Sequence, residues 1–259
     1  MAKVLFFGSS HRVSRACLGI LLARNVELTG VVIAPHVSSP QPIEGEIWPP
    51  NQPIPHRLWI TWADQPHTLP PIVAAARDSD LVCSCFYDYP IREPILSAPR
   101  IGAVNLHPSY LPYNRGRHSA FWGIYRGTPM GATLHWMDDG LDTGPIIAQK
   151  EYEPDWLESA ATIYEAQSNL CVDLFAEWLP RLLAGDAPAK PQGEGGEFHR
   201  ARDIQVAATL PMNASVLVRD VLKLIRATSM GDHGFYITDG EHRIKVKARI
   251  TGVESLDQH

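Results

Sequence analysis

Residues 101–144, IGAVNLHPSYLPYNRGRHSAFWGIYRGTPMGATLHWMDDGLDTG, contain two predicted strands and a group of polar side chains around them. The stretch opens on an apolar run that predicts a buried strand, and residues 131–137 alternate like a second strand. Asn105 and His107 stand two residues apart at the end of the first strand, so their side chains project to the same side. Asp142 follows the second strand, in a turn rich in Asp and Gly. The stretch therefore predicts an amide, an imidazole and a carboxylate at neighbouring strand ends.

The chain before this stretch predicts a parallel sheet. Residues 3–8 predict a short buried strand, residues 11–25 carry apolar side chains at helical spacing, and residues 26–34 predict another strand. A strand–helix–strand unit of this kind implies parallel pairing with a right-handed crossover. The other elements expected before the C-terminal part are a proline-rich loop at 35–55, a brief strand at 57–61, a helix at 68–77, a strand at 80–86, a helix at 118–126, a strand at 145–152 and a long amphipathic helix at 159–183.

Residues 185–196, GDAPAKPQGEGG, are the clearest boundary in the chain, because six of them are Gly or Pro. We expect an N-terminal domain at 1–185 and a small C-terminal region at 186–259, which holds a capped amphipathic helix at 213–228. A hairpin of strands 235–238 and 243–250 is expected to turn at Asp239-Gly240. The predicted class is α/β, a Rossmann-like, mostly parallel open sheet with helices on both faces, plus a small C-terminal α+β extension.

Composition and charge narrow the classes of function. The chain has 259 residues and a formal net charge of −5, which offers no broad basic face for RNA or DNA and counts against a tRNA substrate. The four cysteines are too few and too scattered for a disulfide framework, and they lack the spacing of a zinc site, so no metal is expected. No apolar run approaches the roughly 18 residues of a membrane span. Without a signal peptide before Lys3, a cytoplasmic location is expected.

Two motifs follow one another in the central stretch: Asn105-x-His107-x-Ser109 with Leu111-Pro112 and Gly116, then His135 seven residues before Asp142-Thr143-Gly144. Their order and spacing resemble the folate-dependent formyltransferase family, which includes glycinamide ribonucleotide, methionyl-tRNA and sugar N-formyltransferases. The resemblance is strong over residues 81–150 and weaker but co-linear over residues 1–80. Residues 111–122, LPYNRGRHSAFW, are most similar to the nucleotide-sugar branch.

The resemblance implies the formyltransferase fold and an enzyme that uses N10-formyltetrahydrofolate as co-substrate. For the sugar branch it implies a nucleotide-linked amino-deoxy sugar as acceptor, in surface polysaccharide, O-antigen or lipopolysaccharide biosynthesis. Relatives commonly pair as dimers, and the hairpin at Asp239-Gly240 is a candidate homodimer contact.

Formyl transfer to an amine needs a donor aimed at the developing oxyanion and a carrier for the amine proton. Asn105 is an uncharged donor suited to the oxyanion, and His107 can donate to it or take the proton. Asp142 can accept a hydrogen bond from the imidazole or from a water. Taken singly, each of these residues is more often structural: a turn residue, a core histidine and a loop cap. Taken together, their spacing favours the catalytic interpretation.

The residues that would contact the folate, called the folate wall below, are predicted from the resemblance. In the family, the pterin ring binds main-chain groups of loops beyond the strand ends. Tyr87 and Tyr89 are equally consistent with loop packing. The residues predicted to contact the co-substrate are Phe86, Tyr87, Asp88, Ile91, Met137, Asp138, Asp139 and Gly140.

The acceptor wall is predicted from the turn after the first strand and from a loop beside the polar cluster. The turn at Ser9 and Ser10 lacks the GxGxxG pattern of a dinucleotide fold, so no NAD is inferred. The two serines form either a tight turn with a helix cap or, as the resemblance favours, a phosphate contact. One of Arg115 and Arg117, on either side of Gly116, is expected to hold a diphosphate, the alternative being two solvated arginines. Trp122 is assigned to a core aromatic face or, less favoured, to a base or sugar contact, and His135 is left open between core and substrate.

Three kinds of function compete for this sequence: a sugar N-formyltransferase, another enzyme of the same fold, and a non-catalytic protein with a relic site. A methionyl-tRNA enzyme would bring a larger, more basic second domain, a glycinamide ribonucleotide enzyme would end near residue 185, and a formyltetrahydrofolate hydrolase would carry a further domain before Lys3. A non-catalytic protein with a relic site would have lost one of the three polar residues. The sugar N-formyltransferase is the function predicted.

Overall fold

The computed structural model describes residues 1–34, 48 and 60–252, and its main body is a seven-stranded sheet with the order β3-β2-β1-β4-β5-β7-β8. The strands from β3 to β5 pair in parallel, and β7 and β8 add antiparallel pairs at one edge. This arrangement confirms the predicted α/β class. The bounds are β1 Lys3–Gly8, β2 Glu27–Ile33, β3 Ile60–Trp62, β4 Leu81–Cys85, β5 Gly102–His107, β7 Met130–Trp136 and β8 Ile146–Tyr152.

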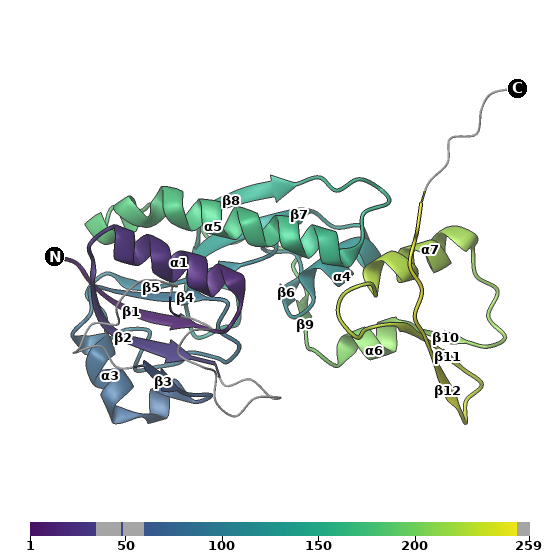
Figure 1. The fold of residues 1–259 in the computed structure, drawn as a ribbon, viewed down its shortest axis with the longest axis horizontal. Coiled ribbons are helices and arrows are strands. Elements are labelled where there is room, and N and C mark those ends of the chain that lie inside the picture. Colours follow the sequence, from purple (N-terminus) through teal and green to yellow (C-terminus); the bar gives the residue numbers. More distant parts are fainter. Residues whose placement is uncertain (35–47, 49–59, 253–259) are drawn as a thin grey trace, which may run out of the picture.

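Helices cover both faces of the sheet (Figure 1). Helices α1 (Arg12–Ala23) and α5 (Ala160–Ala184) cover one face, and α3 (Pro70–Arg77), which follows the short turn η1 (Pro66–Thr68), covers the other. Alternation along β1 explains this, because successive side chains of a strand point to opposite faces. Val4 and Phe6 pack under α1 and α5, whereas Leu5 and Phe7 pack under α3. Because this strand is buried on both faces, its sequence is a continuous apolar run.

Two helix starts differ from the prediction. Helix α1 is capped by His11, whose Nδ1 accepts from the Val13 amide at 3.2 Å, and not by Ser9 or Ser10. In the C-terminal part, α7 spans Val218–Ala227 and has no side-chain cap, so the predicted capped start at residue 213 is wrong. Just before residue 213 the chain still pairs with β11, because the Met212 amide donates to the Thr238 carbonyl. The predicted loop at 35–55 lies outside the described residues apart from residue 48, and of the strand at 57–61 only the end is described, in β3.

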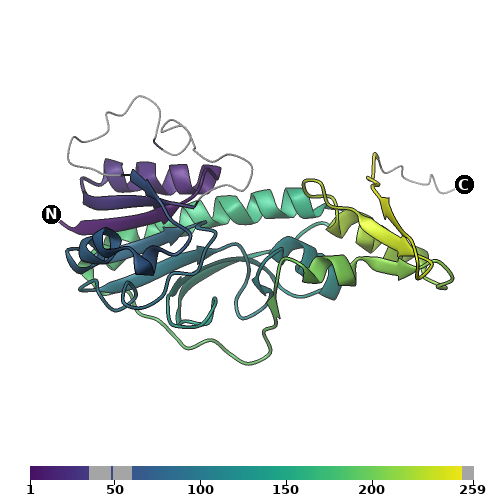
Figure 2. The same ribbon diagram turned by 90° about the horizontal axis from the view of Figure 1, so that it is seen from below.

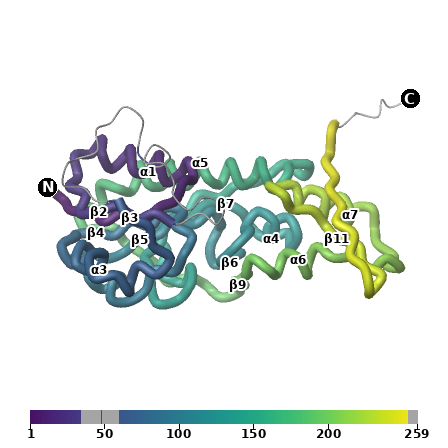
Figure 3. Tube along the Cα trace, turned by 60° about the horizontal axis from the view of Figure 1, so that its bottom comes forward, coloured from purple at the N-terminus to yellow at the C-terminus, as the bar shows by residue number. Residues whose placement is uncertain are grey.

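The C-terminal part packs at one end of α5, away from α3 (Figures 1 and 3). Its short elements form a three-stranded sheet with α6 and α7, and the predicted hairpin is present, its second strand ending at Val246. Buried apolar side chains from α4, α5, α7 and β11 share one cluster: Phe121, Ile124, Ile163, Leu224 and Phe235. The bounds are α4 Ser119–Arg126, α6 Asp203–Ala207, β10 Thr209–Pro211, β11 Phe235–Thr238 and β12 Arg243–Val246.

The segment after α5 runs back along the main sheet before it reaches the C-terminal part (Figure 2). Lys190 exchanges two backbone hydrogen bonds with Ile146 at the start of β8, of 2.8 and 2.9 Å. Further on, β9 (Phe198–His199) pairs in parallel with β6 (Arg115–Gly116). Residues 185–196, predicted as a boundary, are therefore hydrogen-bonded to elements of the first 185 residues.

Among the described residues, no helix combines the length and apolarity needed to cross a bilayer.

Candidate active site

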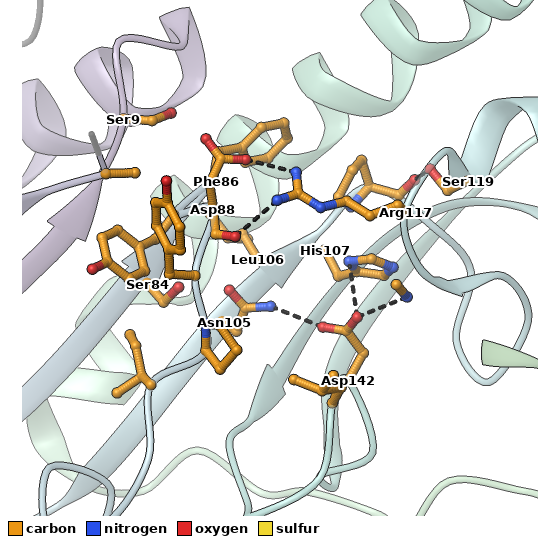
Figure 4. Close-up of a pocket in the computed structure, with 18 of the residues that line it drawn as sticks. Ser9, Ser84, Phe86, Asp88, Asn105, Leu106, His107, Arg117, Ser119 and Asp142 are labelled. Atoms are coloured by element: carbon orange, nitrogen blue, oxygen red, sulfur yellow. Dashed lines mark hydrogen bonds and ion pairs between the residues drawn. The ribbon is translucent and has the colours of Figure 1, made fainter. Parts of the chain in front are cut away.

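Asn105, His107 and Asp142 meet in the structure (Figure 4). The first two lie at the end of β5, and the third lies in the loop between β7 and β8. Asn105 Nδ2 is 3.3 Å from Asp142 Oδ1, and His107 Nδ1 is 3.7 Å from Asp142 Oδ2. The amide of Gly116 donates to the same Oδ2 at 2.9 Å. All four residues line a cavity of about 540 Å³, so the side chains that the sequence placed at neighbouring strand ends are in one site.

His135 lies beside Asn105 across the β5–β7 pair. Its Nδ1 is 2.7 Å from the Trp136 carbonyl oxygen, so Nδ1 carries the hydrogen and Nε2 accepts from Asn105 Nδ2 at 3.2 Å. Burial lowers the pKa of His135, which keeps the imidazole neutral near pH 7. Both hydrogens of the Asn105 amide therefore point at protein acceptors, and donation to an oxyanion would replace the 3.3 Å contact with Asp142.

The loop that carries Asp142 has a strained backbone. Asp142 has φ of 55°, a left-handed conformation that costs a non-glycine residue about 1–3 kcal/mol. Gly144 fits because a Cβ there would lie 1.9 Å from the Trp136 carbonyl oxygen. Thr143 Oγ1 donates to Asp138 Oδ1 at 2.6 Å. These contacts hold the Asp142 carboxylate toward His107 and Gly116.

The predicted folate wall mostly faces the cavity. Asp139 does not line the cavity, so its position does not support that prediction. The other seven residues line it: Phe86, Tyr87, Asp88, Ile91, Met137, Asp138 and Gly140. The Tyr87 hydroxyl donates to the Ala63 carbonyl, and burial raises the pKa of Tyr87. Tyr87 thus anchors the loop, and its ring packs edge-on against Phe7.

Five residues of the predicted acceptor wall line the cavity: Ser9, Ser10, Gly116, Arg117 and His135. Arg117 extends across the mouth to Asp88, with Nη1 2.6 Å from Oδ1 and Nη2 2.8 Å from the backbone oxygen. Arg115 points elsewhere, since its Nη2 donates to the Gly196 carbonyl at 2.6 Å. Of the two arginines, Arg117 is therefore the one at the cavity.

The prediction of a ligand contact at Trp122 is not supported by its position. The side chain is only 4% exposed, does not line the cavity, and stacks on His199 with ring centroids 3.8 Å apart. Helix α4 turns this aromatic face into the core, which was the favoured alternative.

Other cavity residues were not found from the sequence. His11 and Tyr164 form an aromatic group with Phe86, and His11 stacks on Phe86 at 4.6 Å. Phe198 and Met230 line the cavity from the C-terminal part. His118, also at the wall, contacts the His233 ring at 4.9 Å, and burial lowers its pKa to about 4. No local sequence pattern marks these residues, because the tertiary fold, and not the neighbouring sequence, brings each of them to the cavity.

Within the described residues, no group of three His, Cys, Asp or Glu side chains is arranged as a metal ion would require.

The central part of the chain matches a known family. Residues 67–178 match the family model described as "Formyl transferase". Methionyl-tRNA formyltransferase of Halorhodospira halophila is 34% identical over 149 residues, which are 57% of this chain and 46% of that enzyme. The dTDP-4-amino-4,6-dideoxyglucose formyltransferase of Mycobacterium bovis is 30% identical over 141 residues, 54% of this chain and 60% of that enzyme. The chain thus matches about half the length of these curated relatives.

Solved structures are similar over most of the chain. A sugar N-formyltransferase from Shewanella sp. has a TM-score of 0.80 at 20% identity, covering 98% of this chain and 100% of that one. The formyltransferase PseJ from Anoxybacillus kamchatkensis has a TM-score of 0.56 at 26% identity, covering 78% of this chain and 87% of that one. Residues 67–178 therefore match the formyl transferase family model, and the chain has the fold of these solved structures.

Proposed function

We propose that this protein transfers a formyl group from N10-formyltetrahydrofolate to the amine of a nucleotide-linked amino-deoxy sugar. The observation that carries the proposal is the meeting of Asn105, His107 and Asp142 in one cavity. Its volume of about 540 Å³ is within the range of small-molecule sites. The PseJ structure holds a UDP-linked formamido sugar and tetrahydrofolate, and the Mycobacterium bovis relative is named for a dTDP-linked amino sugar, which supports this acceptor class.

The two walls of the cavity suit the two proposed substrates. Phe86, Ile91 and Met137 offer apolar surface for a pterin ring, beside main-chain groups of the loops after β4 and β7. The cavity lining also includes Ser9, Ser10 and Arg117, which offer hydroxyl groups and one guanidinium. A planar guanidinium holds a phosphate by two parallel hydrogen bonds. We infer that the diphosphate binds Arg117 and displaces Asp88 from it.

The three polar residues have distinct roles in the proposed transfer. N10-formyltetrahydrofolate supplies the formyl group, and attack by an amine leaves negative charge on the formyl oxygen and a surplus proton on the nitrogen. Asn105 donates to that oxygen, and His107 takes the proton from the amine. The same imidazole would return the proton to N10 as the bond between N10 and the formyl carbon breaks, which releases tetrahydrofolate. Asp142, held by the Gly116 amide, fixes the imidazole and stabilises it once it is protonated.

The identity of the nucleotide and of the sugar can be tested by ligand binding and product analysis. GDP-perosamine is a candidate acceptor, with dTDP- and UDP-linked amino sugars as alternatives, and the product would enter O-antigen or another surface polysaccharide. Thermal unfolding is measured with folate alone and with each acceptor, since a ligand at about 100 times its dissociation constant stabilises by about 2.7 kcal/mol. Stabilisation by folate and one nucleotide class, with formylated product in mass spectrometry, is expected. Absence of both would refute the proposal.

A methionyl-tRNA acceptor is the second candidate, because the relative of 34% identity is named for it. The net charge of −5 argues against RNA binding, which needs a basic surface to neutralise phosphates. Formylation of charged initiator tRNA in the same assay would favour this candidate.

A further inference from the structure

Gln192 lies in the segment that returns along the sheet, and its side chain reaches the Asp142 loop. The amide Nε2 donates to the Asp142 carbonyl oxygen and to the Gly144 carbonyl oxygen, both at 2.8 Å. These two carbonyls flank Thr143, so one side chain bridges the turn that carries the carboxylate. Gln192 is 50 residues from Asp142 in sequence and does not line the cavity.

The turn needs such a bridge because its backbone is strained. A left-handed non-glycine residue persists where the surrounding structure holds it. The φ of 55° at Asp142 sets the direction of the carboxylate, which faces the Gly116 amide and His107. Fixing the carbonyl of Asp142 therefore also fixes where its side chain points.

A primary amide of this length meets both carbonyls. Both Nε2 hydrogens are used, and Gln192 Oε1 is buried without a hydrogen-bond partner among the described residues. The opposite amide orientation would place Oε1 against two carbonyl oxygens, which repel it. A glutamate would create the same repulsion, and an asparagine is one methylene shorter.

The backbone on either side of Gln192 is anchored. Two residues earlier, Lys190 is paired with Ile146. Four residues later, Gly196 lies so close to Pro112 that a Cβ would be 1.8 Å from its carbonyl oxygen, and Gly196 accepts from Arg115. Gln192 is thus presented to the loop from a fixed position.

We propose that Gln192 is a positioning residue, which holds Asp142 in the conformation that aims its carboxylate at Gly116 and His107. The proposal rests on the proposed function for the role of Asp142 in transfer. The segment that the sequence marks as a boundary is, by this proposal, part of the active-site framework.

The test is amide hydrogen exchange at Gly116, because that amide donates to the Asp142 carboxylate and does not touch Gln192. Gln192→Met keeps the length and removes the donors, and it is expected to speed Gly116 exchange at least tenfold. Asp142→Ala should do the same, and the double variant should add nothing to either. The amides of Ile146 and Arg117, which donate to Lys190 and His199, should stay protected, which excludes detachment of the whole segment.

A matched control is Gln149→Met. Gln149 donates to the Leu111 carbonyl and to Thr133 Oγ1, at 2.7 and 3.1 Å, and does not line the cavity. Its loss should leave Gly116 protected. If Gln192→Met does not fold, Gln192→Glu carries the same expectation. Unchanged Gly116 exchange in the Gln192 variant, fast exchange in the control, or protected Gly116 in Asp142→Ala would each overturn the proposal.

Kinetics give a second readout. With an acceptor that the wild-type protein formylates in the assay proposed above, Gln192→Met should lower kcat roughly tenfold to a hundredfold with little change in KM, since misplaced catalytic groups lose rate more than binding. It should have no further effect in Asp142→Ala. The exchange experiment needs no transfer activity, so a wild-type protein that transfers no formyl group would refute the proposed function and leave the positioning role to be decided by exchange.

Discussion

His107 is buried between two acceptors, with Nε2 3.4 Å from the Asn114 carbonyl oxygen and Nδ1 facing Asp142. The ring is therefore held in one orientation with its edge in the cavity. A base fixed in this way contributes through its proton chemistry more than through binding.

His107→Asn is expected to lower kcat by about 10²–10⁴-fold, because the variant keeps a polar side chain and loses the proton acceptor. Folate affinity and the thermal midpoint should change little. Steady-state rates and folate titration measure both, and unchanged turnover would contradict the assigned role.

The two arginines of the 115–117 loop are expected to differ. Arg117→Ala should raise the KM for the nucleotide sugar roughly tenfold, because a charge-assisted hydrogen bond to the substrate is lost. The free energy of unfolding should change little, because the ion pair of Arg117 with Asp88 is half exposed. Arg115→Ala should instead lower the free energy of unfolding by about 1 kcal/mol through loss of its bond to Gly196. The reverse pattern would move the diphosphate contact to Arg115.

His118 is expected to make stability fall at low pH. Burial lowers its pKa from 6.5 to about 4, so between these values the unfolded chain binds a proton that the folded chain does not. The contribution of the neutral side chain to the free energy of unfolding is therefore complete above pH 6.5, and it is lost as the pH falls toward 4. His118→Asn, suited to the left-handed φ of 62°, should make the decline shallower in urea unfolding measured across that range. An unchanged slope would contradict the prediction.

At the scale of elements, the β7–β8 connection brings Asp142 to the end of β5, and Gly144 sets how closely the loop approaches β7. Gly144→Ala should push the loop away, since the Cβ meets backbone, and should lower kcat at least tenfold. Gly127→Ala is the matched control. That glycine ends α4 at φ 68° with open space around its Cβ, so the change should cost about 1–2 kcal/mol of stability and leave kcat intact.

At the scale of the whole molecule, the C-terminal part shares an apolar cluster with α4 and α5, and Phe198 and Met230 from that part line the cavity. Phe198 is 41% exposed there, an aromatic surface available to an acceptor. The division at residue 185 remains a prediction from composition.

Leu224→Ala, in α7, tests how far the two parts are coupled. Removing this buried side chain should cost about 2–5 kcal/mol. Because Leu224 packs in the cluster of α4 and α5, we expect calorimetry to show one transition lowered as a whole. Two transitions, only one of them shifted, would show that residues 186–259 unfold separately.

The sequence by itself was enough to predict the α/β class, most strands and helices of the main sheet, and the three polar residues at neighbouring strand ends. These depend on local burial, turn chemistry and motif spacing, which are properties of short stretches. Helix starts were predicted less well, because histidine is not one of the usual capping residues and α7 begins only after the chain has paired through Met212 with Thr238.

Only the tertiary structure decided which side chains meet across long separations. Arg117 rather than Arg115 faces the cavity, and Gln192 bridges the Asp142 loop, although no pattern near either of them says so. The physical reason is that periodicity reports how one element is buried, whereas these contacts depend on where the chain returns after α5. That path is set by backbone pairing of Lys190 with Ile146 and of β9 with β6, in which side-chain identity has little part.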